Sequence, residues 1–598
     1  MRRRHEMPFG ASPVDGGGAR FRLWAPAAKT VELCLGDETL AMDRAGDGWF
    51  ETTRPARAGA RYRYRIDRDL LVPDPASRFN PDDVHAPSEL VDPLAYEWRD
   101  GAWRGRPWEE AVIYELHVGT FSPEGTYAGV ERRLDALAGL GVTAVELMPL
   151  ADFPGARGWG YDGVLPYAPD SAYGRPEDLK RLVDGAHARG LMMFLDVVYN
   201  HFGPDGNYLH AYARQFFTER YATPWGAAID FEDERPVREF FVQNALYWLE
   251  EYRFDGLRFD AVHAIHDASR PDIVEEIADR VRSGPGRERE IHLVLENDAN
   301  RARYLARGPD GRPRRYTAQW NDDAHHAFHV LLTGESDGYY SDYADKPAAR
   351  LARCLAQGFA YQGEPSAFRD GETRGEPSAH LPPTAFVSFI QNHDQVGNRA
   401  LGERISRLAS EAALEVAMTV LLLAPSPPML FMGDEFAAAT PFLFFCDFSG
   451  DLARAVTEGR RREFAGFEKF RDPAAADPIP DPGDPGTFER SKLDWASLSR
   501  EPHASFLATV RRLLELRRRE IVPLVSGIRG GSASTLEIGA RAIEVRWPSG
   551  AAELVLLANL GDAPEPLREP PAGRLIHATH ADARGTRLPA WSASWWLR

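Results

Sequence analysis

The pattern of apolar and polar positions divides the chain into three parts. Between residues 19 and 72, apolar and polar residues alternate with a period of two and are punctuated by Gly and Pro, which is typical of antiparallel strands. A Pro- and Asp-rich segment, 72–93, then indicates a rigid linker. Short alternating runs return after residue 521. We therefore expect an N-terminal β-sandwich with its linker at 1–93 and a C-terminal antiparallel β domain at 521–598.

The central part, 94–520, has a different pattern. Short runs that are apolar on both faces alternate with amphipathic helical segments, and such repeats imply a parallel sheet covered by helices. The candidate strands are AVIYEL, TAVELM, LMMFLDVV, GLRFD, IHLVLE, YTAQW, TAFVSFIQ and PMLFMG. Helices are expected near 127–140, 176–189, 236–252, 271–282 and 504–520. Eight strands close a TIM barrel, so the predicted class is α/β with a (β/α)8 barrel.

Two loops depart from this regular alternation. Residues 199–235, after the third strand, are longer than an ordinary loop between a strand and its helix, and such loops on a barrel are usually functional. A second Pro- and Asp-rich loop is predicted at 471–486.

Composition limits the possible partners. A net charge of -18 argues against nucleic acid and anionic membranes, both of which favour basic surfaces. The basic N-terminus is not followed by an apolar segment, so no secretory signal is expected. The cysteines, Cys34, Cys354 and Cys446, are odd in number and widely spaced, which favours a reducing cytoplasm. We expect a cytoplasmic protein with no cofactor and no bound metal.

Charged and polar side chains follow four predicted strands, at the carboxyl ends where functional groups of such barrels meet. They are Asp196, Asn200 and His201 after the third strand, Arg258 and Asp260 after the fourth, Glu296 after the fifth, and His393 and Asp394 after the seventh. Any one of the acids alone could be a helix N-cap. Independent caps have no reason to fall on four strand ends beside an arginine, so the set predicts one functional site.

Carboxyl groups on a neutral, aromatic-rich rim suit the cleavage of glycosidic bonds. Arg258 is expected to keep Asp260 ionised, which makes Asp260 the predicted nucleophile. A carboxyl group near other acids in a closed pocket is pushed toward its protonated form, so Glu296 is the predicted acid and then base. Asp394 is predicted to bind ring hydroxyls and to help distort the sugar.

These residues also carry a family resemblance. The stretches DVVYNH, GLRFDAVH, LVLEND and FIQNHD resemble, in that order, the four signature regions of the α-amylase family, within roughly residues 108–440. The resemblance implies a retaining mechanism through a covalent glycosyl-enzyme and the same roles for the three acids. It further implies that the sugar next to the scissile bond is bound by Tyr161, His201, Arg258 and His393.

Other stretches narrow the resemblance. RFRLWAPAAKTVELCL looks like the N-terminal domains of branching enzymes, debranching enzymes and maltooligosyltrehalose trehalohydrolases. YELHVGTFSPEGTYAGV, QWNDDAHHAFH and QNHDQVGNRALGERI look most like the trehalohydrolases. This implies hydrolysis of the α-1,4 bond next to the trehalose end of maltooligosyltrehalose, with a maltooligosyltrehalose synthase as the pathway partner. A glycogen branching enzyme or another α-glucan hydrolase of the α-amylase family is the alternative, and an inactive glycan-binding barrel is disfavoured because all three acids are present.

Release of a disaccharide requires a shaped pocket beyond the cleavage point. The candidates for contacts there are Trp225 in the long loop, His263, and the run Trp320, Asn321, Asp322 and Asp323. Each of these could instead be a packing residue. His325, His326 and His329 have the spacing of metal ligands on a helix, but hydrogen bonding to sugar is the preferred interpretation.

Two departures from ordinary amylases are visible. Many amylases carry a Lys–His pair after the nucleophile, whereas this chain has His263 and Ala264. Asn200 matches a position that binds calcium in many amylases, but 199–235 lacks an obvious cluster of further carboxylate ligands, so no structural calcium is expected.

Overall fold

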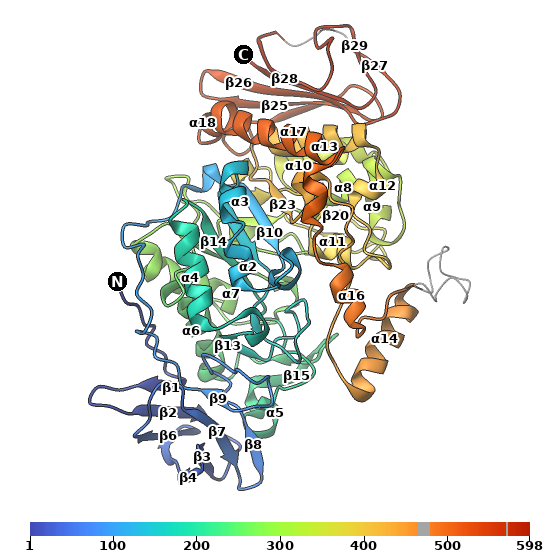
Figure 1. Ribbon diagram of the computed structural model, residues 1–598. Helices are drawn as coiled ribbons and strands as arrows, with labels where there is room; N and C mark the ends of the chain where they lie inside the picture. The colour runs from blue at the N-terminus through green and yellow to red at the C-terminus, as the bar shows by residue number, and fades with distance from the viewer. Residues whose placement is uncertain (465–478, 568, 570–571) are drawn as a thin grey trace.

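The computed structural model describes residues 1–464, 479–567, 569 and 572–598 (Figure 1). The first half of the Pro- and Asp-rich loop predicted at 471–486, residues 471–478, lies outside these residues. Figure 1 shows two small sheets formed by the N-terminal part at the bottom, a helix-covered barrel in the middle and a C-terminal sheet at the top. Within the described part of the chain, no helix is long and apolar enough to cross a membrane.

An eight-stranded parallel sheet forms the centre of the molecule, in the order β22-β19-β18-β17-β14-β11-β10-β23. The bounds are β10 (Ile113–Leu116), β11 (Ala144–Leu147), β14 (Met192–Val197), β17 (Gly256–Phe259), β18 (His292–Leu295), β19 (Ala318–Trp320), β22 (Phe386–Val387) and β23 (Met429–Phe431). A parallel bridge between Ser388 and Pro428 joins the two outer strands. All eight predicted strands and the (β/α)8 barrel are therefore confirmed.

Helices cover the barrel as the amphipathic segments predict. Their bounds are α2 (Tyr127–Glu131), α3 (Leu134–Leu140), α4 (Pro176–His187), α6 (Arg235–Glu250), α7 (Ile273–Ser283), α8 (Asp322–Thr333), α10 (Pro347–Gln357), α13 (Glu411–Leu423) and α17 (His503–Leu516). The single helix predicted at 127–140 is two helices. The helix predicted at 504–520 changes to a π-helical turn at Arg517–Ile521. The buried Arg517 guanidinium there donates to the carbonyl oxygens of Leu422 (3.1 Å) and Ser426 (2.9 Å), which satisfies the end of α13.

The N-terminal part forms two antiparallel sheets. One has the order β1-β2-β6-β5, with β1 (Gly10–Pro13), β2 (Ala19–Trp24), β5 (Asp43–Gly46) and β6 (Trp49–Arg54). The other has the order β4-β3-β7-β8, with β3 (Val31–Leu35), β4 (Glu38–Ala41), β7 (Arg61–Ile66), β8 (Leu70–Val72) and β9 (Ser88–Glu89) beside β7. Segment 72–93 is more than a spacer, because its buried Arg78 bonds to Glu251 after α6 at 3.1 Å.

The C-terminal part is a five-stranded antiparallel sheet in the order β24-β25-β26-β30-β28. The strands are β24 (Ser534–Glu537), β25 (Ala542–Ser549), β26 (Ala552–Asn559), β28 (Arg574–Ala578) and β30 (Ser592–Leu597). The buried Trp547 of β25 donates to the carbonyl of Leu355 in α10 at 3.1 Å. The sheet is thus fixed to the helical wall of the barrel (Figure 1).

A buried ionic network holds the amino end of β17. Asp255 lies just before the strand and accepts bonds from Arg289 (2.9 Å), from the Trp103 indole (2.8 Å) and from the Met193 backbone (2.9 Å). His187, at the end of α4, lies 2.9 Å from the same carboxylate. Although burial alone would raise the pKa of Asp255, His187 and Arg289 bring it below its ordinary value.

The network extends to Asp100, in the segment that leads into the barrel. Its carboxylate lies 2.6 Å from the other ring nitrogen of His187 and accepts a 2.6 Å bond from Arg253. Burial lowers the pKa of His187, but the two carboxylates outweigh burial and raise it above its ordinary value. This end of the barrel therefore matches each buried carboxylate with cations, and the arrangement serves packing and stability.

Candidate active site

Arg258 is the centre of the predicted site at the carboxyl end of the barrel. Its side chain is fully buried and donates to Asp196 (2.6 Å), to Asp260 (2.8 Å) and to Glu296 (2.9 Å). The ring of Trp320 lies below the guanidinium, 4.2 Å from its central carbon to the ring centroid. One arginine thus brings together carboxyl groups from three neighbouring strands, as the strand-end pattern predicts.

The backbone just after β17 and Asp260 turns an N–H group toward Glu296. Ala261 has a left-handed conformation (φ 40°), which a residue with a side chain rarely adopts. Its N–H donates to Glu296 Oε2 at 2.7 Å, the same oxygen that bonds to Arg258. Backbone strain of this kind persists where surrounding contacts hold it, often at functional sites.

The pKa shifts of Asp260 and Glu296 have directions opposite to those that the sequence-based argument predicts. Burial, together with Glu296 and Asp196, raises the pKa of Asp260 well above its ordinary value in spite of Arg258. Burial also acts on Glu296, but Arg258 and His263 outweigh it and lower its pKa. The expectation that Arg258 keeps Asp260 ionised stays a prediction, because Arg258 is shared with Asp196 and Glu296 and its lowering of the pKa of Asp260 is opposed by burial and by these carboxylates.

Asp394 and His393 enter from the seventh strand. Asn392 caps the short helix α11 (His393–Gly397) by accepting from the N–H of Gln395, and this places both residues in the first turn. His393 lies 2.5 Å from Glu115 of β10 and 3.5 Å from Asp394. Burial lowers the pKa of His393, but Glu115 and Asp394 outweigh burial and raise it to about 9. The two carboxylates therefore favour the protonated form of His393.

Tyr161 and His201 form the wall beside these acids. The Tyr161 hydroxyl donates to Asp196 at 2.6 Å, and its ring stacks on His393 with centroids 5.0 Å apart. His201 bonds through Nε2 to the carbonyl of Tyr161 at 2.9 Å. Trp225 stacks on His201 at 4.3 Å and is 48% exposed. The predicted residues Tyr161, His201, Trp225 and His393 therefore lie together.

Trp225 lies in the turn of a hairpin that the sequence did not reveal. The strands are β15 (Phe217–Thr223) and β16 (Gly226–Ile229), within the long loop 199–235. The hairpin accounts for the length of this loop. Its turn places the aromatic side chain of Trp225 over the rim of the barrel.

A pocket opens beside Glu296. Its lining includes Glu296, Asp298, Asp322, His326, Tyr339, Asp342, Tyr343, Phe368, Arg369, Arg374, Asn392, Asp394, Gln395 and Asn398. Tyr339 is 40% exposed and Phe368 is 52% exposed, unusual values for large apolar side chains. Sequence reasoning missed both, because Tyr339 lies in a three-residue 3-10 helix and Phe368 in a turn, and neither is long enough to show a periodic pattern. Their nearness to the predicted acids is visible only in the fold.

The remaining predicted residues divide into two groups. Asp322 lines the pocket, and His263 accepts a 3.3 Å bond from the N–H of Asp298 at its edge. Trp320 and Asn321 are each 1% exposed and do not line the pocket. Trp320 lies under Arg258, and Asn321 caps α8 while donating to Gly358 at 2.8 Å.

Two of the three His residues of α8, His325 and His329, are held by neighbouring protein groups, whereas His326 lines the pocket. His325 lies 2.5 Å from the carbonyl of Ile390, and His329 lies 2.8 Å from Glu335. Asp323 is fully buried and accepts a 2.7 Å bond from Arg374. In the described part of the chain, no group of three or more His, Cys, Asp or Glu side chains is placed to share a metal ion.

Comparisons with known proteins agree with the three-part architecture. The family described as "Alpha amylase, catalytic domain" matches residues 78–243. "Carbohydrate-binding module 48 (Isoamylase N-terminal domain)" matches residues 8–77, and a domain of unknown function (DUF3459) matches residues 530–595.

Relatives match over most of the chain. The malto-oligosyltrehalose trehalohydrolase of Deinococcus radiodurans is 43% identical over 92% of this chain and 89% of its own length. A crystal structure of a Salmonella typhimurium protein described as an alpha amylase is 46% identical, with a TM-score of 0.95 over 99% of this chain and 100% of that one. A branching enzyme of Bacillus caldolyticus is 35% identical over only 42% of this chain and 43% of its own length. The chain therefore belongs to the malto-oligosyltrehalose trehalohydrolase family, within the α-amylase family of glycoside hydrolases.

Proposed function

We propose that this enzyme hydrolyses the α-1,4 bond next to the trehalose end of maltooligosyltrehalose, with Asp260, Glu296 and Asp394 as its catalytic acids. The observation that carries the assignment is the convergence of Asp260 and Glu296 on one guanidinium, with Asp394 on the same rim. Two carboxyl groups around one sugar are what a retaining glycosidase needs.

The two chemical steps are assigned as follows. Asp260 attacks the anomeric carbon while Glu296 gives its proton to the departing glycosidic oxygen, which releases trehalose. Glu296 then removes a proton from water, the water attacks the same carbon, and the bond to Asp260 breaks. One water is consumed, and both carboxyls return to their starting states.

This scheme requires a proton on Glu296 and a charge on Asp260, whereas in the substrate-free site the pKa of Asp260 is raised and that of Glu296 is lowered. The two groups are coupled through Arg258, so their proton belongs to the pair. Positive charge that develops at the anomeric carbon favours ionised Asp260, and the proton is then more stable on Glu296. We propose that the sugar itself sets the working protonation state.

We assign the pocket beside Glu296 to the leaving trehalose, because the acid must face the leaving oxygen. Tyr339 and Phe368 supply exposed aromatic faces for sugar rings, and the carboxyl and guanidinium groups of Asp298, Asp322 and Arg369 supply hydrogen bonds. His263 contributes from the edge of this pocket.

The sugar on the other side of the scissile bond is assigned to a second group of residues. They are Tyr161, His201, Arg258 and His393, with Trp225 as an exposed aromatic wall. Trp320 and Asn321 are proposed to support the site and not to touch sugar, since both are buried.

The substrate implies a partner enzyme. An α,α-1,1 linkage at the end of a maltooligosaccharide must be made before it can be released, and we propose a maltooligosyltrehalose synthase for that step. A cytoplasmic location is proposed as well, supported by the odd number of widely spaced cysteines.

The test is to supply purified enzyme with maltooligosyltrehalose and to measure free trehalose by chromatography. Release of trehalose with no new α-1,6 branches on amylose is the expected result. Branch formation without trehalose would instead show a branching enzyme.

A further inference from the structure

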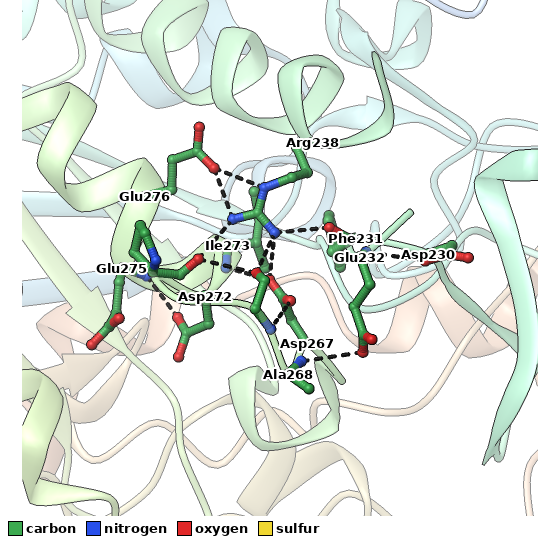
Figure 2. Close-up of polar contacts among 12 residues, drawn as sticks. Asp230, Phe231, Glu232, Arg238, Asp267, Ala268, Asp272, Ile273, Glu275 and Glu276 are labelled. Carbon is green, nitrogen blue, oxygen red and sulfur yellow. Dashed lines mark hydrogen bonds and ion pairs between the residues drawn. The ribbon is translucent and has the colours of Figure 1, made fainter. Parts of the chain in front are cut away.

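A buried arginine joins the long third loop to the loop that follows the nucleophile strand. Arg238, in the first turn of α6, is 8% exposed. Its guanidinium donates to the carbonyl of Phe231 at 2.8 Å, to Asp267 at 2.7 Å and to the carbonyl of Pro271 at 3.1 Å. Figure 2 shows it at the centre of these contacts. Phe231 belongs to the third loop, whereas Asp267 and Pro271 belong to the fourth loop, 261–272.

Glu232 makes a second connection between the same two loops. Its Oε1 accepts a 3.1 Å bond from the N–H of Ala268 in the fourth loop, also drawn in Figure 2. The same oxygen accepts a 2.7 Å bond from the hydroxyl of Tyr221, which lies on the hairpin strand β15. The Tyr221 ring stacks on His266 of the fourth loop, with centroids 4.8 Å apart. We call Arg238 and Glu232 together the clasp.

The two clasped loops carry side chains that the proposed function gives to sugar binding. The hairpin carries Trp225 against His201, and the fourth loop carries His263 against Asp298. Among the described residues, the bonds of Arg238 and Glu232 reach neither Asp260 nor Glu296. The clasp is therefore placed to act on the loops and not on the chemistry.

We propose that Arg238 and Glu232 are positioning residues, which hold the two loops in the register that binds the oligosaccharide. This inference rests on the proposed function. A preformed site does not lose loop conformational entropy when the ligand binds, and its affinity for the ligand is therefore higher. Loss of the clasp removes binding shared by ground state and transition state, which raises KM and leaves kcat nearly unchanged.

Glu232→Ala tests the clasp, since Glu232 is partly exposed and Arg238 with its buried partner Asp267 stays intact. Asp233→Ala is the matched control, because Asp233 and Glu232 both pair with Arg220 but only Glu232 bonds to Ala268. Glu232→Gln keeps an acceptor oxygen and is the rescue variant. The readouts are kcat and KM for trehalose release, together with Tm.

The expected result is a rise in KM of roughly three- to tenfold for Glu232→Ala, with kcat and Tm close to wild type. Glu232→Gln and Asp233→Ala are expected to retain the wild-type KM. In a Trp225→Ala background the effect of Glu232→Ala on KM should be smaller, because the clasp acts partly through that side chain.

Two kinds of failure are distinguishable. A wild-type enzyme that releases no trehalose contradicts the proposed function. A wild-type enzyme that does release it, while Glu232→Ala keeps the wild-type KM or loses kcat instead, contradicts the clasp. An equal effect of Asp233→Ala would also overturn it, since the change would then be one of surface charge.

Discussion

The two ends of β17 use the same kinds of side chain in opposite proportions. At the amino end, one carboxylate, Asp255, receives His187, Arg289, an indole and a backbone N–H. At the carboxyl end, one cation, Arg258, serves Asp196, Asp260 and Glu296. Cations are in excess at the first end and carboxyls at the second.

The difference shows in the pKa values. Burial acts to raise the pKa of both Asp255 and Asp260. At Asp255 the neighbouring cations outweigh burial, and its pKa falls. At Asp260 the neighbouring carboxylates add to the effect of burial, and its pKa rises. Glu146 of β11 adds to the excess of carboxyl groups at the carboxyl end. Its carboxyl is buried, its pKa is raised, and neither oxygen has a hydrogen-bond partner among the described residues. At the amino end the buried carboxylates are matched by cations, which stabilises the fold. At the carboxyl end the buried carboxyl groups outnumber the cations, which is typical of a functional site.

Replacing Glu296 by Gln should have the largest effect. Glutamine cannot give or take the proton, so kcat should fall by roughly 10²- to 10⁴-fold. The fold should not lose stability, because the change removes one of the competing carboxylates around Arg258. Steady-state kinetics and Tm measure the two effects, and a large loss of Tm would contradict the assigned role.

Replacing Asp255 by Asn should have the opposite profile. It removes the carboxylate that His187 and Arg289 share, which should cost about 3–5 kcal/mol of unfolding free energy. Activity per folded molecule should stay close to wild type. Urea unfolding measures the loss of stability, and steady-state kinetics measure the activity. Asp279→Asn is the control, because Asp279 forms a half-exposed pair with Arg315 and its loss should cost about 0–1 kcal/mol.

The pH dependence of stability should separate the two ends further. The folded pKa of His187 is raised, so its contribution is complete below its ordinary pKa of about 6.5 and is lost as pH rises through the folded value. The folded pKa of Asp255 is lowered, so its contribution is complete above about pH 3.9 and is lost on acidification through the folded value. The Tm difference between wild type and Asp255→Asn should shrink at alkaline pH. A Tm difference that stays constant as pH rises would contradict this loss of the His187–Asp255 interaction.

A smaller effect is expected at Glu115. Its carboxylate helps to raise the pKa of His393 to about 9, so Glu115→Gln should move the alkaline limb of the activity profile to lower pH. Glu110→Gln, in the short 3-10 helix Trp108–Glu110 that precedes the same strand, is the control. An unchanged alkaline limb in Glu115→Gln would show that His393 does not set it.

The sequence predicts the barrel well because its strands are apolar on both faces, and the acids follow from where those strands end. It does not reveal the amino-end network, since His187 is 87 residues from Asp100 and 68 from Asp255. It does not reveal Tyr339 and Phe368, because a three-residue 3-10 helix and a turn are too short to show a periodic pattern. The proton order of Asp260 and Glu296 depends on Arg258 being shared, which only the assembled site shows.

The central claim is that Asp260 is the nucleophile and Glu296 its acid and base. Maltosyl fluoride tests it directly in the Glu296→Gln variant, because fluoride leaves without a proton whereas hydrolysis of the intermediate still needs the base. Mass spectrometry of the digested protein should find a maltosyl group on the peptide that contains Asp260. A maltosyl group on another residue, or none while the fluoride is still released, would contradict the account.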